Sequence, residues 1–176
     1  MRDKRFVAEH RGGTLTKDQH RGLVLWACRC VENVLPLIDK GDERLTKAIR
    51  IAKEWTKDNA SVGDARNASF AAIAVANGFS NPIEIAVARS VGHAVATAHM
   101  ADHSLRAADY ALKAIKLAEK AIEMERAYQD NQLPLAIREL VLAARCKQHT
   151  KIQKNQNSGN NEPLTRYCRN GSGELL

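Results

Sequence analysis

Residues 64–78 read DARNASFAAIAVANG, and residues 81–100 read NPIEIAVARSVGHAVATAHM. Both stretches are rich in alanine, and their few polar side chains recur at helical spacing. Asn81 and Pro82 are typical of an N-cap and of the first helical position, so a helix boundary is expected there. Because small side chains let neighbouring helix axes approach closely, the two stretches predict a pair of tightly packed central helices.

Apolar residues at helical spacing also precede these stretches. A long helix is expected after Thr16, a good N-cap, and should end near Val34 because Pro36 cannot continue it. A second helix is expected from Asp42 to about Asn59. The amino-terminal half of the chain is therefore predicted to be mainly helical, with a clear break at residues 11–14 before the long helix.

The helix of residues 64–78 is expected to begin after Ser61 and to stop at Gly78 in a left-handed conformation. After residue 100, one outer helix is expected to begin at Asp102 or Ser104 and to run to a break at residues 130–132. A last helix should reach about Lys151. Beyond it the sequence turns to asparagine, glutamine, serine and glycine, which cannot bury enough apolar area to fold.

These patterns predict an all-α protein. We expect a single compact helical domain of residues 1–153 and a flexible polar tail of residues 154–176. The domain should hold about six to seven helices in antiparallel pairs, arranged as a bundle or as a HEAT-like stack. No strand alternation and no phosphate-binding loop motif were found.

Composition narrows the classes of function. The chain of 176 residues has no apolar run long enough to cross a membrane, so a cytoplasmic location is expected. Cys28 and Cys30 lack the two-residue spacer of a zinc or redox pair, and we interpret them as small packing residues. The net charge of +7 lies mainly at the two ends of the chain. It leaves a nucleic-acid-binding protein as an alternative, although the basic residues are interleaved with acids and lack aromatic neighbours.

Two polar lines cross the alanine-rich middle. Arg89, His93 and Thr97 recur four residues apart, and so do His99 and His103. Three interpretations stay open: histidines that hydrogen-bond neighbouring helices, a polar binding site, and a histidine-based metal site of an enzyme. If His103 falls in the break between two helices, its pairing with His99 would be lost.

A second polar group opens the helix after Ser61. Asp64 and Arg66 belong to it, and an acid in the first turn is favourable for capping alone. Ser69, His93 and Asp64 could be written as a catalytic triad, but Ser69 occupies no strand-to-helix elbow, which argues against catalysis.

Several of these segments together resemble a known family. They are the run from His20 to Pro36, the positions Arg44, Ala48 and Ile49, the pair Glu54-Trp55, the segment of residues 64–72, and the segment from Gly92 through His99 to Tyr110 and Ala111. They resemble bacterial immunity proteins of the immunity-protein-five-like group, from polymorphic toxin systems, over roughly residues 15–116.

This resemblance implies an all-helical cytoplasmic protein that binds and neutralises a cognate toxin, with no reaction and no cofactor. The group brings no established binding residues with it. The candidate binding residues are therefore the matched polar positions, together with Arg89 from the spacing argument: His20, Asp64, Arg66, Arg89, His93 and His99.

Charge constrains the expected partners. An inhibitor that fills a nucleic-acid-binding groove usually presents an acidic face, whereas this chain carries +7. We therefore expect a toxin with a neutral or acidic contact surface, and neither a nucleic acid nor a membrane as partner. Alanine-rich faces would also allow a homo-oligomer, although the sequence shows no self-complementary stripe beyond those that the core requires.

Overall fold

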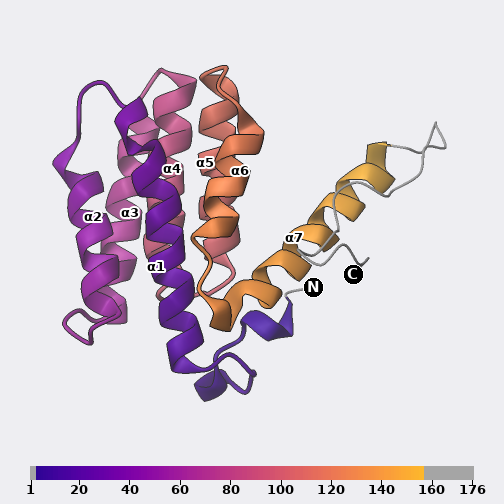
Figure 1. Cartoon of the computed structure of the whole chain (residues 1–176). Coiled ribbons are helices and arrows are strands. Elements are labelled where there is room, and N and C mark those ends of the chain that lie inside the picture. The colour runs from indigo at the N-terminus through magenta and orange to yellow at the C-terminus, as the bar shows by residue number, and fades with distance from the viewer. Residues whose placement is uncertain (1–2, 157–176) are drawn as a thin grey trace. The chain divides into compact units, whose positions relative to one another are not determined.

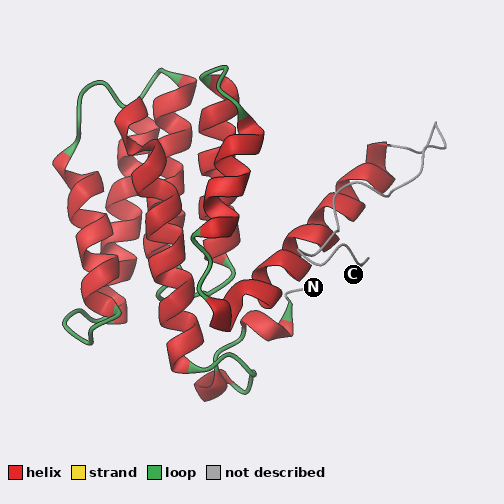
Figure 2. Cartoon of the chain, in the orientation of Figure 1, coloured by secondary structure: helices red, strands yellow, loops and turns green. Residues whose placement is uncertain are grey.

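The computed structural model describes residues 3–156. All the secondary-structure elements named in that range are helices (Figure 2). The predicted all-α class is therefore confirmed. The α-helices are α1 (Lys17–Val34), α2 (Glu43–Trp55), α3 (Val62–Gly78), α4 (Pro82–Ala96), α5 (His103–Leu117), α6 (Ile122–Asn131) and α7 (Leu135–Gln156). Three short 3₁₀ turns accompany them: η1 (Lys4–Phe6), η2 (Glu9–Arg11) and η3 (Leu35–Leu37).

The described residues fall into two units, divided between Ile137 and Arg138. In the first unit α2, α3, α4 and α5 pack in chain order, each antiparallel to the one before (Figure 1). Helix α1 packs across α2, α4 and α5, and α6 contacts both α5 and α1. This arrangement confirms the predicted antiparallel pairs and places α4 at the centre.

Polar caps begin the helices where the sequence predicted them. The Thr16 hydroxyl accepts from the Gln19 N–H, and the Gln19 side chain accepts from the Thr16 N–H in return, which is a complete capping box. Asp42 and Asn81 each accept from a main-chain N–H in the first turn of α2 and α4. Pro36 ends α1 at Val34, as expected.

The ends of α3 and α2 differ from prediction. Helix α3 does stop at Gly78, but without the left-handed conformation that was expected; instead Phe79 is extended, with φ −85° and ψ 146°. This extended step lets the partly buried Phe79 ring pack against the core. Helix α2 ends at Trp55, earlier than predicted, and Asp58 takes a left-handed conformation in the loop that follows.

The prediction of a single helix between residues 102 and 129 was wrong. Helix α5 ends at Leu117, and Glu119 takes a left-handed conformation with φ 55°. The Lys120 N–H then donates to the Ile115 carbonyl at 3.0 Å, which closes the helix end as in a Schellman motif. No glycine marks this break in the sequence, and Ile122 continues the apolar spacing of α5. The apolar periodicity therefore did not reveal the break.

The structure describes only part of the carboxyl-terminal segment of the chain. Helix α7 extends to Gln156, a little beyond the expected end near Lys151. Residues 157–176, most of the predicted polar tail, lie outside the described residues, and the domain limits 1–153 stay a prediction.

Close helix packing on both sides of α4 confirms the role expected of its small residues. A Cβ atom on Gly92 would lie 2.6 Å from Ile73 Cδ1 of α3, so the two helices approach closely there. The Ser69 hydroxyl donates to the Gly92 carbonyl at 3.0 Å, and the Ser90 hydroxyl donates to the Ala107 carbonyl of α5 at 2.6 Å. Both serines are buried, and each bond satisfies a hydroxyl that burial would otherwise penalise.

The amino-terminal segment folds back on itself before α1. Gly12 has a left-handed φ of 78°, and Ala8 and Leu15 form an isolated β-bridge. Phe6 is buried at one end of the segment. Gly13 packs so tightly that a Cβ atom there would lie 1.8 Å from the Val7 carbonyl oxygen. The expected break at residues 11–14 is therefore a folded turn.

Candidate functional site

Asp64 is a capping residue. Its carboxylate accepts from the Ser61 N–H at 2.9 Å and from the Ser61 hydroxyl at 2.7 Å, while the Ser61 hydroxyl oxygen accepts from the Asp64 N–H. These hydrogen bonds lower the pKa of the Asp64 carboxyl group. Because Asp64 is committed to Ser61 and Ser69 to the Gly92 carbonyl, the hydrogen bonds of a triad with His93 are not formed.

Arg66 lies on the exposed side of α3, one turn before Phe70. Its guanidinium carbon is 5.5 Å from the centroid of the Phe70 ring, a cation–π contact. Phe70 is 58% exposed, which is unusual for a large apolar side chain. Arg66 and Phe70 therefore form an ordered pair on the surface.

His20 ties α1 to the end of α4. Its Nε2 lies 2.7 Å from the Thr97 carbonyl oxygen, and since a carbonyl only accepts, Nε2 is the donor. The ring packs against Trp55 of α2, with centroids 5.0 Å apart. His20 is buried, so its visible role is to join three helices rather than to meet a partner.

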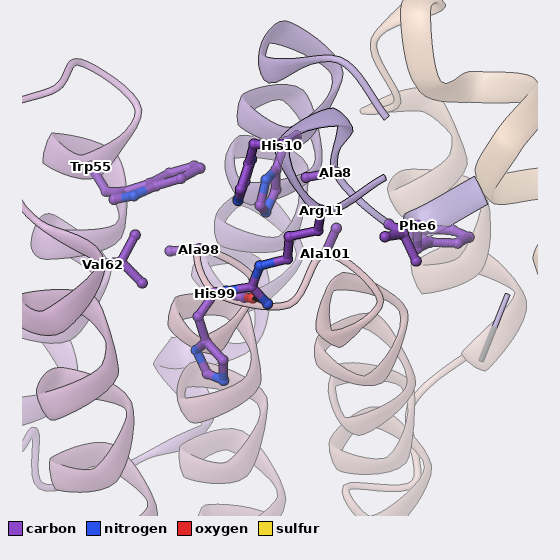
Figure 3. A pocket seen from close by; sticks show the side chains of 11 residues that line it. Phe6, Ala8, His10, Arg11, Trp55, Val62, Ala98, His99 and Ala101 are labelled. Carbon is purple, nitrogen blue, oxygen red and sulfur yellow. Dashed lines mark hydrogen bonds between the residues drawn. The ribbon is translucent and has the colours of Figure 1, made fainter. Parts of the chain in front are cut away.

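A small pocket lies where these helix ends meet the amino-terminal segment. Its volume is about 60 Å³, and its lining includes His20, Trp55, Val62 and His99 (Figure 3). The Arg11 guanidinium crosses from the amino-terminal segment and donates to the His99 carbonyl at 3.4 Å. Such a volume holds a few water molecules but no drug-sized ligand.

His93 belongs to a row of rings on α4 and α5. Its Nδ1 lies 3.0 Å from the Nδ1 of His103, and its ring stacks on Tyr110 at 5.3 Å with an interplanar angle of 11°. His103 also contacts the ring of His99, with centroids 5.4 Å apart. The concern that His103 would be lost to a break was therefore wrong: it is the first residue of α5 and joins both histidines.

Burial and neighbouring charges keep His93 neutral. Partial burial, His103, Arg106 and Arg89 together lower the pKa of His93 to about 4. Arg89 lies one turn before His93 on α4 and is half-buried. At neutral pH His93 is thus an uncharged aromatic ring between two arginines.

The histidines do not assemble a metal centre. Across the part of the chain that the structure describes, no group of three or more histidine, cysteine, aspartate or glutamate side chains is placed to hold a metal ion. Cys28 and Cys30 are buried in α1 and form no disulfide, in the packing role expected of them, and burial raises the pKa of Cys28 to about 12. His93 and His103 instead direct a nitrogen at each other.

The six candidates therefore fall in three places. His20 and His99 line the small pocket, and Asp64 caps α3 beside an open groove of about 360 Å³ between α2 and α3. The other three lie on α3 (Arg66) and on α4 (Arg89 and His93), and these two helices touch where Ile73 of α3 meets Gly92, the residue before His93. With their neighbours on α3 and α5 they form what we name the arginine face: Arg66, Phe70, Arg89, His93, Arg106 and Tyr110.

Three members of this face were missed from the sequence. Phe70 was passed over because a single phenylalanine among alanines looks like core, although its spacing from Arg66 would have paired them. Arg106 and Tyr110 follow His103 on the same side of α5, and that spacing would have linked them to the histidines.

These features define a class: an all-α protein of stacked antiparallel helices in which His20 and His93 contact neighbouring helices, while Arg66 and Phe70 are exposed. Residues 13–136 match the family model described as Imm-5 like putative immunity protein. The chain belongs to this family, as its resemblance in sequence implied. The match ends next to the boundary between the two units and covers α1 to α6. A search of the curated proteins found no match, and neither did a search of the solved structures.

No helix among the described residues is both long enough and apolar enough to be a membrane span.

Proposed function

We propose that this protein is an immunity protein that binds a cognate protein toxin and neutralises it by non-covalent contact, in the cytoplasm and without catalysing a reaction. Membership of the immunity-protein family is the observation that carries this proposal, because the match spans all of α1 to α6. Neutralisation by binding requires only a complementary surface, and it needs no reactive group.

The chemistry of the polar residues is consistent with binding. His20, Ser69 and Ser90 each donate to a main-chain carbonyl of another element, so each serves helix packing. The exposed Phe70 with its arginine neighbour, by contrast, has the composition of a protein contact surface, where aromatic residues and arginine are enriched.

The net charge favours one kind of toxin. At +7 the chain would be repelled by a basic toxin, attracted by a toxin with an acidic contact surface, and not repelled by one whose contact surface is neutral. Nucleic acid is also negatively charged and could bind the same basic surface. The experiments therefore include a test of nucleic-acid binding.

The proposal is tested by mixing the full chain with the toxin domain encoded beside its gene. Size-exclusion chromatography should show a stable complex, calorimetry should give a measurable Kd, and co-expression should restore growth of cells that make the toxin. The same column reports whether the free protein self-associates. A chain that binds no neighbouring-gene product and protects no cell, but shifts DNA or RNA at low salt, would refute the proposal in favour of nucleic-acid binding.

A further inference from the structure

The arginine face combines an exposed apolar anchor with a fixed cation. Phe70 is 58% exposed, and the Arg66 guanidinium is held 5.5 Å from its ring centroid. An arginine already ordered over a ring loses less side-chain entropy when a partner binds it. Aromatic and arginine side chains of this kind carry most of the energy in protein interfaces.

The neighbouring helices extend this anchor into a broader surface. On α4 and α5, the stacked rings of His93 and Tyr110 form a flat platform, with an interplanar angle of 11°. Arg89 and Arg106 lie near His93 on either helix, close enough for their charges to act on it. The platform is thus an uncharged ring stack with a cation on each side.

The six named members of the face include three cations and no acid. Three guanidinium groups, those of Arg66, Arg89 and Arg106, come from three different helices. Asp64, the acid nearest to Arg66 on α3, accepts hydrogen bonds from Ser61 at the start of its helix. Arginine forms bidentate pairs with carboxylates, so carboxylates spaced across a surface are the complement of this arrangement.

We propose that the arginine face is the surface on which the toxin docks, and that the toxin presents to it an acidic patch with an apolar recess for the Phe70 ring. This inference rests on the proposed function. A protein is favoured over nucleic acid because the exposed Phe70 ring lies one turn from the partly buried Ile73 on α3, and such apolar surface is better buried by a protein than by a phosphate backbone.

The test uses the full chain and the toxin domain encoded beside its gene. Phe70→Ala should raise the Kd at least about tenfold, as loss of an interface anchor does. The triple variant Arg66→Ala, Arg89→Ala, Arg106→Ala should slow association and remove most of its dependence on salt. Two matched controls lie on other elements: Arg29→Ala on α1 removes an exposed cation, and Met124→Ala on α6 removes a side chain that is 74% exposed. Both controls should leave the Kd within about twofold.

The outcomes separate the surface from the function. If the wild type binds the toxin and the Phe70 and arginine variants bind as tightly as the controls, the docking surface is wrong and the proposed function stands. If the wild type does not bind the toxin, both fail. A DNA or RNA duplex at the same ionic strength is the third arm, and binding there that depends on the three arginines but not on Phe70 would assign the face to nucleic acid instead. Thermal unfolding of each variant shows whether it is folded.

Discussion

The imidazole rings of His93 and His103 meet nitrogen to nitrogen, with their Nδ1 atoms 3.0 Å apart. A hydrogen bond between two Nδ1 atoms needs one ring to donate and the other to accept, so at least one ring carries no proton on that nitrogen. The pair joins α4 to α5 at the edge of the arginine face. The geometry of this pair therefore allows at most one proton between the two Nδ1 atoms.

Acid should weaken the fold through this pair. The pKa of His93 is lowered to about 4 by burial and by the charges of His103, Arg106 and Arg89, whereas unfolded histidine titrates near its ordinary value of 6.5. Between these two pH values His93 binds a proton in the unfolded chain but not in the folded chain. The free energy of unfolding should thus fall as pH drops from about 6.5 to about 4, with a contribution from His93 of at most about 1.4 kcal/mol per pH unit.

This pH dependence is measured by urea unfolding at a series of pH values in the wild type and in His93→Gln. Glutamine cannot titrate, so its curve should be flatter over that range. Equal slopes in the two proteins would mean that His93 does not carry the effect.

Replacing Gly92 with alanine should destabilise the protein by about 1 kcal/mol, because the added Cβ would lie 2.6 Å from Ile73 Cδ1 and force that side chain to move. In an Ile73→Ala background the obstacle is gone, and the better helix propensity of alanine should make the same change stabilising. A double-mutant cycle by chemical denaturation measures this coupling. Gly78→Ala, where no atom lies within 4 Å, is the matched control.

Gly13→Ala should detach the amino-terminal segment from the helices. A Cβ atom there would lie 1.8 Å from the Val7 carbonyl oxygen, and a main-chain atom cannot rotate away as a side chain can. Amide hydrogen exchange of residues 4–15 should accelerate while that of α4 stays unchanged. Gly41→Ala, with open space around it, should alter neither region; protection that survives in Gly13→Ala would contradict the packing described here.

Glu119→Gly should stabilise the protein by up to about 1 kcal/mol, since Glu119 has a left-handed φ of 55° that glycine adopts without strain. Asp58, with φ 63°, provides the contrast. It pairs with Arg21 and Lys17, and Asp58→Gly would lose those contacts together with the strain. Thermal unfolding of the two variants should therefore show a clear gain for Glu119→Gly alone.

The helices could be predicted because their beginnings carry local signals. Thr16, Asp42, Ser61 and Asn81 each cap a helix with a side-chain oxygen, and no long-range information is needed to recognise such a cap. The end of α5 could not be predicted in this way. It depends on Glu119 adopting a conformation that its residue type rarely takes, and the apolar spacing continues across the break.

The candidate residues could be identified from the sequence, but the sequence could not tell which of them are buried and which are accessible to a partner. The family resemblance picks out His20 and His93 alike, yet His20 is buried in a hydrogen bond to the Thr97 carbonyl, while His93 is half-buried and feels the charges of two arginines. What separates them is which neighbouring helix covers each ring. Phe70 was overlooked for the same reason, because exposure follows from packing and not from residue type.

The hydroxyls of Ser69 and Ser90, which tie α4 to α3 and α5, are buried, whereas Arg66 and Phe70 are exposed on α3 and Arg106 is exposed on α5. Apart from His93, which also joins α4 to α5, the side chains that hold the fold and those proposed to meet a partner are thus different residues. Surface substitutions away from packing features change stability little. A lineage under pressure from a new toxin could therefore exchange the outward set without refolding the scaffold, and the same helices would serve as a constant frame for a changing recognition surface.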